Sequence, residues 1–240
     1  MPYYYYGFDW TYLVIVLPCL ILSMLASSSV KSTFNKYAKV NSIRRLTGAE
    51  AAQRVLSANG VRGVRIERVS GNLTDHYDPK TNVIRLSDSV YGSASVAAIG
   101  VAAHEAGHAV QYAQNYGPIK VRAAIIPITN IGSKLAMPLI LAGILLSFLG
   151  GLSNTLVYLG ILAFSLSIIF QLVTLPVEFN ASRRAMEAIE SAGLLTHEEQ
   201  QGARKTLKAA AMTYVTATAV AVAQVVRLLI LFGGRGRRRD

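Results

Sequence analysis

The sequence predicts a mainly helical membrane protein that carries one small α+β domain. Hydrophobic residues make up 52% of the chain and charged residues only 15%, against roughly 25% charged residues in soluble domains. Long apolar stretches recur along the chain, and one long polar stretch, residues 31–133, follows the first of them. Helix-capping and alternating patterns in that polar stretch indicate a folded domain that contains both helices and strands.

The apolar stretches are candidate membrane-spanning helices. They cover residues 10–26, 135–151, 156–177 and 209–232. A spanning helix needs about 20 mostly apolar residues, with roughly 17 as the lower limit. The first three stretches qualify. The fourth contains Gln224 and Arg227, so we expect it either to span the membrane or to adhere to it, with Arg227 facing protein rather than lipid.

The first apolar stretch is expected to be an uncleaved anchor. Residues 1–9 contain no Lys or Arg, whereas a signal peptide begins with a basic region. The tyrosines at positions 3–6, together with Trp10, are typical of an interfacial aromatic belt.

Basic residues crowd the other end of the stretch, at Lys31, Lys36, Lys39, Arg44 and Arg45. The positive-inside rule then places the N-terminus outside and the polar domain in the cytoplasm. If the fourth stretch crosses the membrane, the arginine-rich tail at residues 235–239 lies outside, which disagrees with this rule.

The polar stretch opens with local signals for helix and strand. Thr47 and Glu50 form a capping box, which predicts that a helix begins there. Residues 64–69 alternate between apolar and charged side chains, as in a half-buried strand. Residues 73–77 and 83–86 flank a turn and predict a β-hairpin.

A helical run, residues 93–114, follows the hairpin and contains the motif His104-Glu105-Ala106-Gly107-His108. Positions i and i+4 of a helix lie on one face, with Cβ atoms about 5–6 Å apart, so both imidazoles can reach one tetrahedral Zn²⁺. Glu105 is placed to act as the general base toward a water at the metal. Gly107 costs the helix about 1 kcal/mol relative to Ala, which indicates that another backbone or a substrate passes close by. These features predict an α+β zincin-like catalytic domain.

Catalytic zinc usually keeps three protein ligands, so a third is required. We consider Cys19, His76, His197 and Glu178. Cys19 lies within the first apolar stretch, and His197 belongs to a second capping box, formed by its neighbours. Glu178 is preferred, because it follows the third apolar stretch and is expected to begin a helix there. The alternative is that Glu178 only stabilises that helix N-terminus.

Five segments follow from this interpretation. They are an N-terminal transmembrane anchor (1–30), the zincin-like catalytic domain (31–133), a transmembrane helical hairpin (134–177), a helical segment with the third zinc ligand (178–208), and an apolar helix with a basic tail (209–240). The single cysteine excludes an internal disulfide and fits a reducing cytoplasmic compartment.

Three blocks of the sequence carry a resemblance to a known family. They are H-E-A-G-H-A at 104–109, L-T-D-H-Y-D-P at 73–79 and L-P-V-E-F-N-A-S at 175–182. With these blocks the chain resembles, nearly end to end, the bacterial membrane-bound neutral zinc metallopeptidases of the YugP type, and it is similar in layout to HtpX-like proteases. The resemblance implies a multi-pass membrane zinc endopeptidase that binds one Zn²⁺ per chain. It further implies that His104, His108 and Glu178 are the ligands and Glu105 the base.

Other features admit more than one interpretation. His76, Tyr77 and Tyr214 are candidates for stabilising an oxyanion, although packing or turn hydrogen bonds are preferred for them. The net charge of +11 is concentrated beside the apolar stretches, where it favours the lipid bilayer as partner rather than nucleic acid. We expect protein or peptide substrates, including membrane proteins. The alternative function is a catalytically inactive, zinc-stabilised membrane adaptor or scaffold, against which the presence of Glu105 argues.

Overall fold

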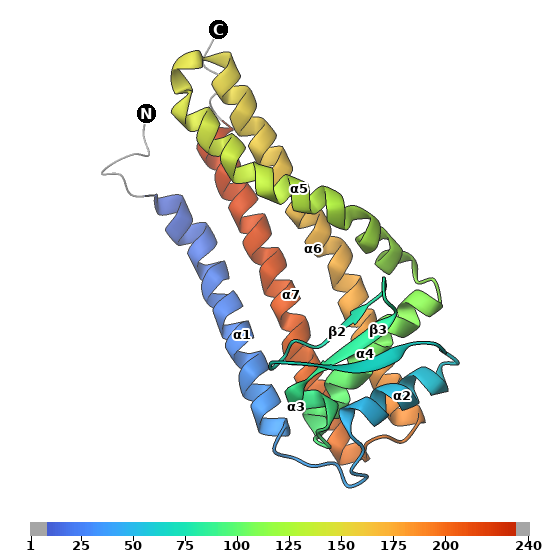
Figure 1. Cartoon of the computed structure of the whole chain (residues 1–240). Coiled ribbons are helices and arrows are strands. Elements are labelled where there is room, and N and C mark those ends of the chain that lie inside the picture. The colour runs from blue at the N-terminus through green and yellow to red at the C-terminus, as the bar shows by residue number, and fades with distance from the viewer. Residues whose placement is uncertain (1–8, 234–240) are drawn as a thin grey trace. The chain divides into compact units, whose positions relative to one another are not determined.

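The structure is a computed structural model that describes residues 9–233 of the chain. Its elements are a short π-helix (Tyr12–Val16) that continues into α1 (Leu17–Tyr37), then α2 (Gly48–Ala58), β1 (Arg65–Val69), β2 (His76–Asp78), β3 (Val83–Ser87), α3 (Asp88–Tyr91), α4 (Val96–Ala113), α5 (Gly117–Leu145), a 3₁₀ turn (Ser147–Leu149), α6 (Gly151–Ser191) and α7 (His197–Phe232) (Figure 1). The prediction of a mainly helical chain with a small amount of strand is confirmed.

Internal contacts divide the chain into two compact units. We call one the apolar unit (Met1–Leu25, Val121–Thr174 and Tyr214–Asp240) and the other the mixed unit (Ala26–Lys120 and Leu175–Thr213). This division differs from the segments expected from the sequence, since α5 already begins at Gly117 and belongs to the apolar unit from Val121 onward. The expected boundary at residue 133 lay beside Lys134, the charged residue just before the second apolar stretch, whereas α5 begins at Gly117 and already contains Lys120, Arg122 and Lys134.

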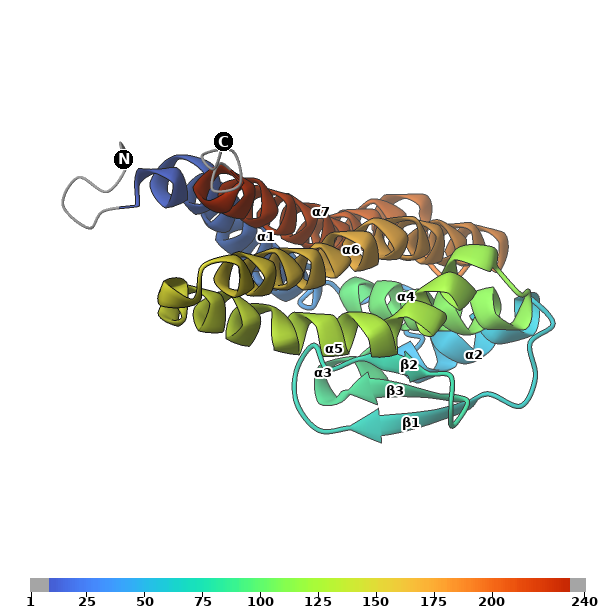
Figure 2. The ribbon, with the colours of Figure 1, turned by 90° about the horizontal axis from the view of Figure 1, so that it is seen from above.

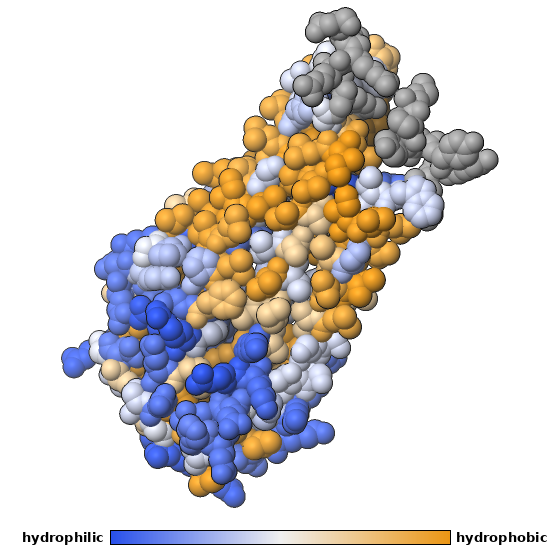
Figure 3. Space-filling view, turned by 180° about the vertical axis from the view of Figure 1, so that it is seen from behind, coloured by the Kyte–Doolittle hydropathy of each residue, from blue (hydrophilic) through white to orange (hydrophobic). Residues whose placement is uncertain are grey.

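The apolar unit exposes hydrophobic side chains along its helices. In the described part of the chain, four helices are long and apolar enough to cross a membrane: Tyr12–Tyr37, Gly117–Leu145, Gly151–Ser191 and His197–Phe232. Large apolar residues of this unit are well exposed, for example Val14 at 71% and Leu162 at 65%, and Figure 3 shows such side chains over much of the unit's visible face. Exposed apolar surface of this extent, on helices long enough to cross a bilayer, supports association with a membrane.

Three contacts inside the apolar unit correct or refine the expectations. Residues 151–155 belong to the first turns of α6, and the chain reverses at residues 146–150. The Ser153 hydroxyl donates to the Gly143 carbonyl at 2.6 Å. Arg227 of α7 forms an ion pair with Asp9 and stacks over Tyr12, with the guanidinium carbon 5.4 Å from the ring centroid. Arg227 therefore faces protein, as expected. The aromatic residues 3–6 and the arginine-rich tail lie outside the described residues.

The mixed unit is a small sheet packed on helices. Its strand order is β1-β3-β2, with β1 parallel to β3 and β2 antiparallel to β3, so the predicted hairpin is confirmed (Figure 2). β2 and β3 lie against α4, and α2 packs along α4 as well. The predicted capping box at Thr47 is present, since its side chain accepts from the backbone N–H of Glu50. Ser95 caps α4 in the same way.

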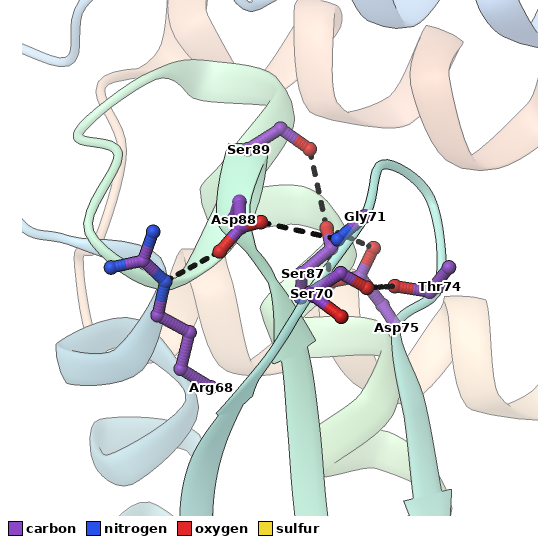
Figure 4. Close-up of polar contacts among 8 residues, drawn as sticks. All are labelled: Arg68, Ser70, Gly71, Thr74, Asp75, Ser87, Asp88 and Ser89. Atoms are coloured by element: carbon purple, nitrogen blue, oxygen red, sulfur yellow. Dashed lines mark hydrogen bonds and ion pairs between the residues drawn. The ribbon is translucent and has the colours of Figure 1, made fainter.

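The joint between β3 and α3 is held by two carboxylates (Figure 4). Asp75 accepts from the Ser87 backbone N–H at 2.7 Å and from its hydroxyl, although burial raises the pKa of this carboxyl. Asp88 accepts from Arg68 Nε at 2.5 Å and from the Gly71 N–H at 3.1 Å. Both ties fix the loop before β2, and thereby β2 itself, beside the helix that carries the H-E-x-x-H motif.

The largest departure from expectation concerns Glu178. The helix expected to begin there is the continuation of α6, which runs unbroken from Gly151 to Ser191 with Pro176 inside it. Glu178 therefore does not stabilise a helix N-terminus. The buried face of this part of α6 is apolar, with Val177, Ala181 and Ala185 each 0% exposed. This packing offsets the backbone hydrogen bond that Pro176 cannot donate.

Candidate metal centre

Two helices of the mixed unit bring the motif histidines and Glu178 together. His104 and His108 lie on α4 and Glu178 lies on α6. Their approach depends on Gly107: a Cβ added there would lie 2.8 Å from the carbonyl oxygen of Ala181. The glycine between the histidines thus admits the α6 backbone. Of the two explanations that the sequence offered for Gly107, the close approach of a second backbone is the one observed.

The ligand atoms have the spacing of a metal site. Nε2 of His104 lies 3.3 Å from Oε2 of Glu178, and Nε2 of His108 lies 3.6 Å from the same oxygen. Ligands bound tetrahedrally at about 2.1 Å are roughly 3.4 Å apart. The two imidazole rings are 4.7 Å apart, edge to face. Two nitrogens and one carboxylate oxygen at this spacing suit Zn²⁺ without rearrangement of the helices.

Each histidine is oriented through its other ring nitrogen. Nδ1 of His108 lies 3.0 Å from Oε1 of Gln111, and Nδ1 of His104 lies 3.1 Å from the Ser182 hydroxyl. A hydrogen on each Nδ1 leaves Nε2 unprotonated and directed toward Glu178. Partners of this kind fix both the tautomer and the ring orientation of metal-binding histidines.

Gln111 also joins the two helices. It is fully buried, and its Nε2 donates to the Val177 carbonyl at 2.8 Å and to Oδ1 of Asn180 at 2.9 Å. Asn180 Oδ1 accepts a further bond from Nε of Arg184 at 2.7 Å. The residues on either side of Glu178 in α6 are therefore tied to the helix that carries the histidines.

The site contains two carboxylates, those of Glu105 and Glu178. Burial alone would lower the pKa of His108, but contact with the Glu178 carboxylate and the nearby charge of Glu105 outweigh it, so the pKa of His108 lies above its ordinary value. A carboxylate pair beside two imidazoles attracts a cation in a partly dry environment, where charges interact more strongly than in water.

Glu105 differs from Glu178 in how its carboxylate is bonded. It is 8% exposed, yet its carboxylate forms no hydrogen bond or ion pair with any residue of the described chain. Acidic side chains are rarely buried without a partner. A buried acid in this state is available to a molecule that enters the site.

The remaining candidates lie elsewhere. His76 is exposed at the start of β2, with Nδ1 2.8 Å from the Thr74 carbonyl oxygen. Tyr77 donates its hydroxyl to Asn82 at 2.8 Å, and its ring lies 5.6 Å from that of Tyr112, one turn beyond His108. Tyr214 belongs to the apolar unit. The remaining third-ligand candidates, Cys19 in α1 and His197 at the start of α7, are not part of the cluster.

Sequence reasoning assigned no role to Gln111, Asn180 or Ser182. A signal existed for each of them. Gln111 is a long polar side chain three residues after His108, on the same face of an otherwise apolar helix. Asn180 and Ser182 follow Glu178 at spacings of two and four residues. Their partners lie 69 and 78 residues away along the chain, so only the fold reveals the pairing.

Comparison with known proteins agrees with this site. Residues 12–233 match the family described as "Putative neutral zinc metallopeptidase". The chain belongs to this zinc metallopeptidase family. It is also 45% identical over 221 residues to the "Putative membrane protease YugP" of Bacillus subtilis (strain 168), covering 92% of this chain and 96% of that protein. No solved structure matches. The predicted resemblance to the YugP-type zinc metallopeptidases is thereby confirmed.

Proposed function

We propose that the protein is a membrane-embedded, zinc-dependent endopeptidase in which His104, His108 and Glu178 hold the metal and Glu105 is the general base. The observation that carries this proposal is the contrast between the two buried glutamates. Glu178 contacts both histidines, whereas Glu105, on the same helix as the histidines, forms no hydrogen bond or ion pair within residues 9–233, the part of the chain that the structure describes. An adaptor stabilised by zinc needs the first carboxylate but not the second.

Zinc bound by these ligands would supply a Lewis acid that polarises a peptide carbonyl and lowers the pKa of water. The chain supplies the other functions. Gln111 and Ser182 hold the imidazoles in place, and Glu105 accepts the proton of the attacking water at a carboxylate oxygen and passes it to the leaving amide nitrogen.

The membrane arrangement is part of the proposal. We propose a multi-pass protein whose mixed unit faces the cytoplasm, following the basic residues after the first span. We further propose that α7 crosses the membrane, because Arg227 near its C-terminal end pairs with Asp9 at the N-terminal end of the first helix. An ion pair of this kind lowers the cost of placing Arg227 near the membrane. Protein or peptide chains, including membrane proteins, are the proposed substrates.

The decisive experiment compares Glu105→Gln and Glu178→Gln with the wild-type protein, purified in detergent. Glu105→Gln fills the same space but cannot take a proton, so casein cleavage is expected to fall by about 10²–10⁴ while about one zinc per chain remains bound. Glu178→Gln is expected to lose most of the zinc and, with it, activity. Zinc is measured by atomic emission after dialysis.

Two outcomes would count against the proposal. If the Glu105→Gln protein cleaves casein as fast as wild type, Glu105 is not the general base. If the Glu178→Gln protein keeps all of its zinc, Glu178 is not a ligand. Wild-type protein that binds zinc but cleaves no casein or membrane-protein substrate favours the adaptor. As a control, Glu190→Gln alters an exposed acid of α6 and should change neither measurement.

A further inference from the structure

We propose that the mixed unit carries a binding site for the phosphate headgroup of an anionic lipid, in a pocket between α1 and α7. The pocket has a volume of about 350 Å³, and its lining includes Ser29, Thr33 and Lys36 of α1 together with Lys205, Lys208 and Met212 of α7. We call it the basic pocket. Its volume is within the range of small-molecule sites, roughly 300–1,000 Å³. The inference does not depend on the proposed peptidase activity.

The charge of the basic pocket has one sign. Three lysines line it and no acidic residue does. In the described chain none of the three forms an ion pair with an acid; the Lys36 ammonium lies over the Tyr37 ring at 5.6 Å from the centroid. The hydroxyls of Ser29 and Thr33 add hydrogen-bonding groups. The three lysines are exposed, and a hollow lined by charges of one sign raises the local concentration of ions of the opposite sign.

A neighbouring groove shows that this pattern is not general. The groove between α6 and α7 also contains three cationic side chains, Arg183, Arg204 and Lys208, but Glu187 and Glu190 lie in it as well. Arg183 pairs with Glu187 at 3.8 Å. Lys208 lines both, so the contrast rests on Lys36 and Lys205, which line only the basic pocket, where no acidic residue lies.

The position along the helices identifies the anion as a lipid. Lys31 is the first charged residue of α1, and Lys208 is the last one before the uncharged residues 209–226 of α7. Ser29 and Met212 therefore line the end of the pocket that lies toward the uncharged parts of α1 and α7. Lys36 and Lys205 line the end that lies toward the charged parts of the same helices. The helices run in opposite directions here, since Tyr37 lies against Gly202. A phosphate can contact the lysines while its acyl chains remain beside Met212, as basic pockets between membrane helices bind lipid headgroups.

The test titrates the full-length protein, in neutral detergent, with phosphatidylglycerol and counts bound lipid by native mass spectrometry. Phosphatidylcholine and inorganic phosphate are run in parallel. We expect saturable binding of phosphatidylglycerol, weaker binding of phosphatidylcholine, and no displacement by millimolar inorganic phosphate. Preference for phosphatidylcholine, or displacement by inorganic phosphate, would overturn the assignment to an anionic lipid.

Two charge variants separate a pocket from a diffuse basic surface. Lys36→Gln/Lys205→Gln/Lys208→Gln is expected to weaken phosphatidylglycerol binding about a hundredfold, at about fivefold per lysine. The matched control, Lys31→Gln/Lys39→Gln/Lys120→Gln, removes the same charge from exposed lysines that do not line the pocket and should change binding less than threefold. Equal losses in the two variants would refute a localised site.

A third variant keeps every charge. Ser29→Phe fills the pocket from the membrane side and is expected to weaken phosphatidylglycerol binding at least tenfold. If the triple lysine variant fails to fold, the Ser29→Phe variant still tests whether the lipid binds in the basic pocket. Unchanged binding by Ser29→Phe would show that the lipid does not occupy this pocket.

Discussion

At the scale of single residues, Gln111 is the most informative side chain near the metal centre. It is fully buried, lies 3.0 Å from Nδ1 of His108 and donates to the Val177 carbonyl on the helix of the opposing ligand. A buried polar side chain that satisfies three partners fixes their geometry, and its loss leaves each of them without a hydrogen bond in a dry environment.

We therefore expect Gln111→Leu, which keeps the approximate volume, to weaken zinc binding by about 10- to 100-fold, as is usual for residues that orient a metal ligand. Competition with a zinc-sensitive chelator measures the affinity without reference to catalysis. Gln53→Leu, an exposed glutamine of α2, is the control and should bind zinc normally. Equal zinc affinity in wild type and Gln111→Leu would show that His108 needs no such partner.

At the scale of secondary-structure elements, the packing of α4 on α6 depends on Gly107. A methyl group there would lie 2.8 Å from the Ala181 carbonyl oxygen, so Gly107→Ala forces the helices apart. Overpacking of this kind costs about 1–3 kcal/mol. We expect a lower melting temperature and weaker zinc binding, measured by differential scanning fluorimetry and chelator competition. Gly117→Ala, at the start of α5 with open space around it, should be neutral or slightly stabilising. A stabilised Gly107→Ala protein would contradict this packing.

The β2–β3 hairpin is held by Asp78, which accepts from the Thr81 hydroxyl, the Lys80 N–H and Arg85. These bonds lower the pKa of Asp78 from 3.8 to about 2. The folded value lies below the unfolded one, so the carboxylate stabilises the hairpin above about pH 4, and this contribution is lost as the pH falls through 2.

Asp78→Asn should consequently unfold at a lower urea concentration than wild type at pH 6, and the difference should shrink as the pH falls from 4 toward 2. Urea titrations of the two proteins in detergent at several pH values measure this. Glu190→Gln, an exposed acid outside the hairpin, serves as control and should show little difference at any of them. A difference between wild type and Asp78→Asn that grows with acidification would contradict the role given to Asp78.

At the scale of the whole molecule, the proposed topology can be tested with single cysteines in a Cys19→Ser background. Lys80→Cys in the mixed unit should resist an impermeant thiol reagent in intact cells and react after lysis. Phe148→Cys should react from outside; its side chain is 77% exposed, whereas Ser153 in the same region is buried. If α7 crosses, Gly236→Cys should also react from outside. Protection of Gly236→Cys alone would show that α7 does not cross, and the opposite pattern at Lys80 and Phe148 would reverse the orientation.

The sequence by itself determined the features that depend on neighbours along the chain. The H-E-x-x-H spacing places His104 and His108 on one helical face, capping residues such as Thr47 mark where helices begin, and runs of uncharged residues identify the apolar helices. The hairpin around Asp78 is likewise local. Each of these follows from backbone periodicity or from hydrogen bonds within a few residues, so no knowledge of distant contacts is required.

Only the tertiary structure decided where Glu178 lies and what surrounds it. From the sequence, the end of the third apolar stretch at residue 177 indicated that a helix begins at Glu178; a proline inside a helix costs about 3 kcal/mol, yet Pro176 lies inside α6. Buried contacts of Val177, Ala181 and Ala185 keep α6 continuous instead. The same packing, admitted by Gly107, brings Glu178 to the histidines and gives Gln111 and Ser182 their partners. Such contacts join residues about 70 positions apart, and their energies exist only once the two helices have met.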